Sequence, residues 1–133
     1  MPQLRVGLAQ INPTVGDIDG NRARALEWCQ KAADSACHVV LLPEMWLTGY
    51  PIEDLALRES FQIASERAVQ QLAADLVAAQ LGDLVVVVGH LARSAAEQKL
   101  GVPAGAPQNA ASVIHQGAVV AQYAKHHLPN YGV

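Results

Sequence analysis

The chain has 133 residues, of which 51% are apolar and 16% are charged, and its net charge at pH 7 is −3. This composition excludes a disordered chain and predicts one domain that can bury a core. Scattered basic residues and an aromatic content of 5% argue against a nucleic-acid partner. No apolar run approaches the ~20 residues of a membrane span, and the N-terminus does not resemble a signal peptide. We therefore expect a cytoplasmic protein without membrane contact, whose two cysteines are thiols.

The hydrophobic pattern predicts strands that alternate with helices. The predicted elements are, in chain order, a strand at 4–9, a helix at about 21–36, a strand at 38–42, a helix at about 58–80, and strands at 84–88, 110–114 and 118–123. Asp19 or Asn21 is the expected N-cap of the first helix. Turn and breaker residues predict loops at 48–54 and 115–117 and a surface insertion at 93–108. This order of elements predicts an α/β layered fold.

One carboxylate and one ammonium follow two of these strands. Glu44 comes just past the strand at 38–42, and Lys125 just past the strand at 118–123. Because functional side chains of such sheets gather at strand ends, we expect both to face one pocket. Desolvation would raise the pKa of Glu44 and suit it to act as a general base, and Lys125 could stabilise an oxyanion. On spacing alone, a surface acid or helix-cap partner and an ordinary strand-end lysine remain the alternatives.

The two cysteines are candidate nucleophiles, but their positions favour structural roles. Cys29 falls on the apolar stripe of the first predicted helix, where a small buried thiol is common. Cys37 is adjacent to His38 in sequence, and neighbouring side chains of a strand point to opposite faces, so the two are not expected to form a dyad. We therefore expect both thiols to be inert.

Metal and nucleotide sites are not predicted. His115, His126 and His127 match no common zinc-ligand spacing. The loop at 12–17 lacks both glycine patterns that cradle phosphates.

Several short motifs occur together and in one order. They are Ala9-Gln-Ile-Asn-Pro-Thr-Val-Gly-Asp17, Leu42-Pro-Glu44, Thr48-Gly-Tyr-Pro-Ile-Glu-Asp-Leu55, Val88-Gly-His90, Asn109-Ala-Ala111, Tyr123-Ala-Lys125 and Leu128-Pro-Asn-Tyr-Gly-Val133. With these motifs the chain resembles the nitrilase superfamily of carbon–nitrogen hydrolases and, more closely, the glutaminase domain of glutamine-dependent NAD+ synthetases. The Pro-Glu strand end marks only the superfamily, whereas the motifs at 48–54 and 128–133 together are more specific.

The resemblance implies that residues 1–133 are the N-terminal portion of an α-β-β-α sandwich. It also implies a Glu–Lys–Cys triad, with Glu44 as general base, Lys125 as the oxyanion-stabilising lysine, and Tyr50 and Tyr131 lining a glutamine pocket. The implied reaction releases ammonia from glutamine for NAD+ synthesis from the deamido dinucleotide. The implied partners are glutamine, a synthetase domain of the parent chain and further copies of the subunit.

The departures from the family pattern set further expectations. The family's nucleophilic cysteine follows the lysine, and this sequence contains no cysteine after Lys125. We therefore expect a fragment without glutaminase activity of its own. No cofactor is expected in it, whereas ATP and magnesium are expected for the absent synthetase domain. A sandwich cut after its fifth strand should expose the strands at 84–88 and 118–123 and self-associate. The alternatives are another amidase of the superfamily, of the ω-amidase or carbamoylase type, and a non-catalytic interaction module on the same fold.

Overall fold

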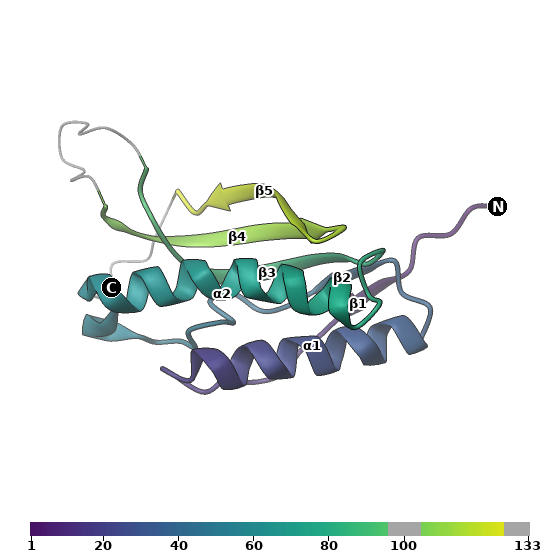
Figure 1. Cartoon of the computed structure of the whole chain (residues 1–133), viewed down its shortest axis with the longest axis horizontal. Helices are drawn as coiled ribbons and strands as arrows, with labels where there is room; N and C mark the ends of the chain where they lie inside the picture. The colour runs from purple at the N-terminus through teal and green to yellow at the C-terminus, as the bar shows by residue number, and fades with distance from the viewer. Residues whose placement is uncertain (96–104, 127–133) are drawn as a thin grey trace.

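A five-stranded sheet forms the centre of the computed structural model, which describes residues 1–95 and 105–126. The strands are β1 Val6–Leu8, β2 Val39–Leu41, β3 Val85–Arg93, β4 Pro107–His115 and β5 Ala118–Ala124, and they lie in this order across the sheet. Strands β1, β2 and β3 are parallel, and β4 and β5 continue the sheet antiparallel (Figure 1). The predicted α/β fold class is confirmed.

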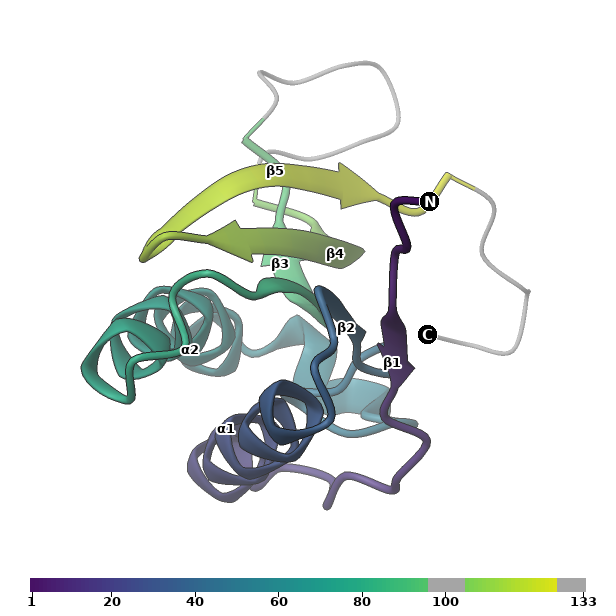
Figure 2. The same ribbon diagram turned by 90° about the vertical axis from the view of Figure 1, so that its right-hand side faces the viewer.

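Two long helices pack on one side of this sheet, as Figure 2 shows. They are α1 (Ile18–Asp34) and α2 (Glu59–Ala78), and a short 3-10 helix η1 (Glu53–Leu57) precedes α2. The main core lies between the helices and the sheet, where Val86 and Val88 of β3 are fully buried in the same cluster as Cys29, Leu72 and Leu76. Among the described helices, none combines the length and the apolar character that a membrane span requires.

The opposite face of the sheet has no helix over it within the described residues. Side chains alternate between the two faces of a strand, and those pointing away from the helices include Leu8, which is 62% exposed, and Tyr123, which is 61% exposed. The expected exposure of the strand at 118–123 is confirmed. The expected exposure of the strand at 84–88 is wrong for Val86 and Val88, because β3 is the central strand and its helix-facing side chains are covered.

The start of α1 differs from the prediction. The helix begins at Ile18, and the side chain of Asp17 caps it by accepting a hydrogen bond of 3.0 Å from the Gly20 amide. Neither Asp19 nor Asn21 is the N-cap. Asn21 is instead completely buried, where its side chain bonds the backbone of two loops.

The predicted loops are also shorter in the structure. Residue Glu53, expected in a loop, opens η1. The insertion expected at 93–108 overlaps both strand ends, because the register of β3 and β4 continues to the pair Arg93 and Pro107. A proline is compatible with the first residue of a strand. Residues 96–104 of the expected insertion lie outside the described residues.

Candidate active site

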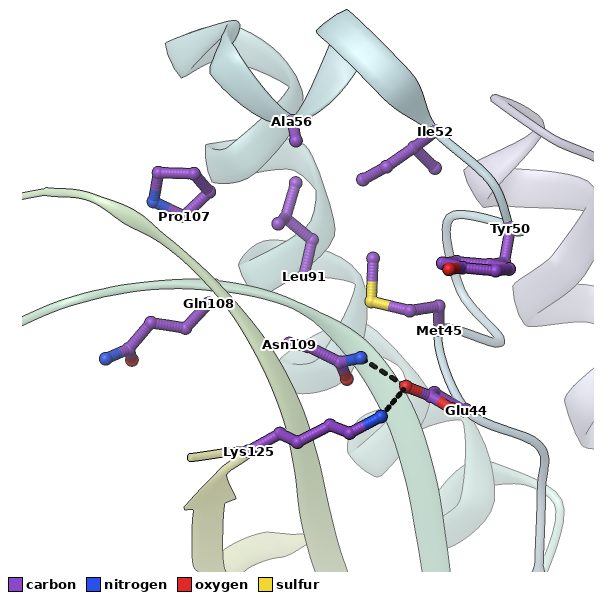
Figure 3. Close-up of a pocket in the computed structure, with 10 residues that line it drawn as sticks. All are labelled: Glu44, Met45, Tyr50, Ile52, Ala56, Leu91, Pro107, Gln108, Asn109 and Lys125. Carbon is purple, nitrogen blue, oxygen red and sulfur yellow. Dashed lines mark hydrogen bonds and ion pairs between the residues drawn. The ribbon is translucent and has the colours of Figure 1, made fainter. Parts of the chain in front are cut away.

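Glu44 and Lys125 form an ion pair at one end of the sheet. The Lys125 ammonium nitrogen Nζ lies 2.8 Å from Glu44 Oε1, although 81 residues separate them in sequence. The Glu44 side chain is 54% exposed and the Lys125 side chain 40% exposed, and both line one pocket (Figure 3). The prediction that the two residues share a pocket is confirmed.

Backbone contacts to β3 hold the turn that carries Glu44. The Leu42 amide donates to the Val87 carbonyl at 2.9 Å, and the Leu47 amide donates to the Gly89 carbonyl at 3.1 Å. Between these two bonds the turn lies directly on Gly89. A Cβ at Gly89 would approach the Met45 nitrogen to 2.5 Å, which is closer than real Cβ contacts, so glycine is needed for this approach.

Asn109 of β4 joins the two charged residues. Its side-chain amide donates a hydrogen bond to Glu44 Oε1, and its backbone carbonyl accepts a hydrogen bond of 2.8 Å from the Lys125 amide. Asn109 was not among the residues expected at the site. The available signal was the motif Asn109-Ala-Ala111, in which an asparagine directly precedes the predicted strand at 110–114.

The pocket has a volume of about 150 Å³. Its apolar wall is a small cluster of buried side chains, formed by Met45, Ile52, Ala56 and Leu91. Figure 3 shows this wall facing the polar groups Glu44, Asn109 and Lys125. The remaining lining residues are Tyr50, Pro107 and Gln108.

Of the two tyrosines expected at the pocket, only Tyr50 is among the described residues. It lines the pocket and is 53% exposed. Tyr131 lies outside the described residues, so its expected place remains a prediction.

The pKa of Glu44 shifts in the direction opposite to the expected one. The hydrogen bond from Lys125 lowers this pKa most strongly, desolvation opposes the shift, and the hydrogen bond from Asn109 lowers the pKa further. The pKa of Lys125 is raised, chiefly by its hydrogen bond to Glu44. The expected increase for Glu44 is wrong because the carboxylate is half exposed and paired with a cation. At neutral pH the site therefore holds a carboxylate and an ammonium.

Neither cysteine lines this pocket. Cys29 is completely buried in the main core, and burial raises its pKa to about 12, as expected for an inert thiol. Cys37 is half-buried and packs near Gly7, where a Cβ would lie 3.2 Å from its sulfur. His38 uses its Nδ1 to accept a hydrogen bond from the Arg5 amide.

The histidines near the C-terminal end of the described chain do not gather with other ligands. His115 Nδ1 faces the Leu84 carbonyl at 3.5 Å, and the His126 ring packs edge-on against Tyr123. Within residues 1–95 and 105–126, no three side chains of His, Cys, Asp or Glu come together as a metal site would require. His127 lies outside this part of the chain.

Comparison with known proteins identifies the family. Residues 5–133 match the carbon-nitrogen hydrolase family. The chain belongs to this family. The carbon–nitrogen hydrolase chain is 38% identical, over all 133 residues, to the glutamine-dependent NAD(+) synthetase of Thermotoga maritima, and 33% identical to that of Acinetobacter baylyi. It spans only 21% and 22% of the length of these two relatives.

Solved structures agree with this assignment. The structure of a glutamine-dependent NAD+ synthetase from Acinetobacter baumannii, in complex with ADP, matches the whole chain with a TM-score of 0.76 and 32% identity. The chain covers 23% of that protein. An amidase of the nitrilase superfamily from Nesterenkonia matches 97% of the chain with a TM-score of 0.72 at 19% identity, which shows a shared fold.

Proposed function

We propose that this chain is the N-terminal part of the glutaminase unit of a glutamine-dependent NAD+ synthetase. The observation that carries the proposal is the Glu44–Lys125 ion pair at the mouth of an apolar pocket. The relatives that match the chain over its full length are named glutamine-dependent NAD(+) synthetases, which supports glutamine as the substrate.

The two charged residues supply two of the three functions that amide hydrolysis requires. Glu44 is ionised at neutral pH, so it can accept the proton of a cysteine thiol as the sulfur attacks the carboxamide carbon. Lys125 is positively charged and can stabilise the oxyanion that forms on the amide oxygen. When the tetrahedral intermediate collapses, the C–N bond breaks and the protonated Glu44 returns its proton to the leaving nitrogen. Ammonia leaves, and water then hydrolyses the thioester to glutamate.

The nucleophilic cysteine in this scheme comes from a segment outside the 133 residues. Cys29 is unsuitable because it is buried in the main core with a raised pKa. Cys37 is unsuitable because it does not line the pocket. Both observations support a nucleophile elsewhere in the parent protein.

The apolar wall suits the aliphatic part of glutamine. The side chains of Met45, Ile52 and Leu91 would contact the two methylene groups, while the amide reaches the charged pair. Tyr50 at the rim, and Tyr131 by the family resemblance, would contact the polar end of the substrate. The same proposal implies a synthetase domain that uses ATP and magnesium, a homo-oligomeric assembly and a cytoplasmic location.

The test uses the full-length protein that contains this chain. Glu44→Gln and Lys125→Ala should each lower glutamine-dependent NAD+ synthesis by about 10²–10³-fold or more, because each removes one preorganised charge. Synthesis from free ammonia should continue, since it does not use this pocket. Glu27→Gln and Lys31→Ala are matched controls, because these residues form an ion pair of 3.2 Å on the surface of α1.

The outcome distinguishes the alternatives. Equal loss of the glutamine-dependent and ammonia-dependent reactions would make the pair structural. Hydrolysis of other amides, but not of glutamine, would indicate an ω-amidase or a carbamoylase. A protein that hydrolyses no amide would indicate an interaction module.

A further inference from the structure

A single residue of β4 contacts both members of the charged pair. Asn109 is held in the sheet opposite Leu91 of β3, and its carbonyl fixes the backbone of Lys125 through a bond of 2.8 Å. Its side-chain amide reaches Glu44 in the turn after β2. The relative placement of Glu44 and Lys125 therefore depends on the register of β4.

Both donors bind the same carboxylate oxygen. Lys125 Nζ and Asn109 Nδ2 each donate to Glu44 Oε1, and within the described residues no hydrogen bond to Oε2 is present. An ionised carboxylate only accepts hydrogen bonds, so Asn109 must present its NH2 group here, which defines the orientation of the amide. Two donors on one oxygen, one from β4 and one just past the end of β5, restrict the rotation of the carboxylate, and Oε2 has no partner among the described residues.

Apart from the charged residues Glu44 and Lys125, the neighbours of Asn109 in the sheet are apolar. The next side chains of β4 on the same face are Ala111 and Val113, and the cross-strand neighbour Leu91 belongs to the apolar wall of the pocket. A polar side chain is therefore not needed there for packing. Its amide contacts Glu44, and not another side chain of the wall.

We propose that Asn109 is a positioning residue that holds Glu44 Oε1 against Lys125 and keeps Oε2 free to accept the proton of the nucleophile. In this role Asn109 acts through Glu44 and not on the reacting atoms themselves. The contact by which Asn109 holds the Glu44 carboxylate lies within this chain, so it can be tested without the rest of the parent protein. The consequence for turnover rests on the proposed function.

The first test measures the Glu44 carboxylate directly in this chain. The protein is labelled with δ-¹³C glutamate, titrated by NMR below the concentration at which it self-associates, and the Glu44 signal is assigned with Glu44→Gln. Asn109→Ala should raise the pKa of Glu44, because a hydrogen bond to the charged form is lost. Asn109→Asp should raise it further, because a second carboxylate replaces the donor.

Gln108→Ala is the matched control, because Gln108 lines the same pocket from the same strand without a hydrogen bond to Glu44. It should leave the titration unchanged. If Asn109→Ala loosens β4, Asn109→Thr favours the strand and lacks a donor of equal reach, so it should give the same upward shift. A Glu44 titration that is identical in wild type, Asn109→Ala and Asn109→Thr would overturn the proposal.

The second test measures turnover in the full-length protein. Asn109→Ala should lower kcat for glutamine by up to about 10²-fold, because a misplaced base is a less effective one. KM should change little, and the acidic limb of the pH–rate profile should move to higher pH. A lower kcat with an unmoved acidic limb would contradict positioning through Glu44. A wild-type protein without glutaminase activity would refute the proposed function, while the NMR titration would still decide whether Asn109 holds Glu44.

Discussion

Glu44 lies so close to Gly89 that a Cβ on the glycine would be 2.8 Å from the Cα of Glu44. The same Cβ would lie 2.5 Å from the Pro43 carbonyl oxygen. These neighbours are backbone atoms, which cannot move aside as the end of a flexible side chain can. The turn that carries Glu44 therefore packs directly against the backbone of β3 at Gly89.

Gly89→Ala should displace this turn and lower the stability of the chain. Overpacking of a tight site costs about 1–3 kcal/mol, and the displaced Glu44 should lose its alignment with Lys125. Urea unfolding measures the first effect and the NMR titration of Glu44 measures the second. Gly82→Ala is the control, because the nearest atom to a Cβ there is 3.5 Å away. Equal behaviour of the two variants would show that the turn adapts without cost.

The Glu44–Lys125 pair should make stability depend on pH at both extremes. The pKa of Glu44 is lowered in the folded chain, so its contribution is present above the ordinary value of 4.5 and is lost as the pH falls through the lowered pKa. The pKa of Lys125 is raised, so its contribution is present below 10.5 and is lost as the pH rises through the raised pKa.

The free energy of unfolding of Lys125→Met should therefore differ most from that of the wild type between these pH limits. The difference is expected to be small, because both side chains are substantially exposed. It should disappear at pH values below the folded pKa of Glu44. Urea unfolding of both proteins from pH 2 to pH 8 checks this, with Lys31→Met as a control for loss of a surface ion pair. A difference that persists at the lowest pH would mean that Lys125 stabilises the fold by packing.

Asn21 should be one of the polar residues whose substitution lowers the stability of the chain most. Its buried side chain accepts from the Thr14 amide and donates to the Thr14 and Leu47 carbonyls. Asn21→Ala leaves the buried Leu47 carbonyl without this partner, at a cost of about 1–3 kcal/mol, and also removes the two part-buried bonds to the exposed Thr14. Urea unfolding should show the loss. Gln30→Ala on the same helix removes only an exposed side-chain bond to Asp34 and should change stability little.

The purified chain should release no ammonia from glutamine, because neither of its cysteines lies at the pocket. In the folded protein, a thiol reagent should modify the half-buried Cys37 slowly, and it should modify the completely buried Cys29 only after unfolding. Ammonia release and the time course of thiol modification provide the measurements. Glutaminase activity that disappears on Cys37→Ala would contradict the proposed location of the nucleophile.

The helix-free face of the sheet should cause self-association. Leu8 and Tyr123 are exposed there, at 62% and 61%, and exposed apolar faces and unpaired strand edges bind other chains. Light scattering at micromolar concentration should show oligomers, which Leu8→Glu with Tyr123→Glu should reduce. Val77→Glu, at an exposed position of α2, is the control. A monodisperse wild-type monomer with cooperative unfolding would contradict this expectation.

The sequence alone determined the layers of the fold and two of the residues at the site. Apolar periodicity is a local property, so it predicted both helices to within a few residues and all five strands. Glu44 and Lys125 could be selected because each follows a strand, and strand ends of such a sheet gather functional groups. The motifs at 42–44 and 48–55 identified the superfamily without any structural information.

The tertiary structure decided what depends on register and on contacts between distant segments. Pairing of β3 with β4 extends both strands beyond their apolar runs and brings Asn109 to Glu44, and no local pattern encodes this register. The direction of the Glu44 pKa shift followed from the same contacts, because two donors outweigh the desolvation that the neighbouring apolar residues suggested. Which strand is covered also depended on strand order, since β3 became the central strand only through its partners on both sides.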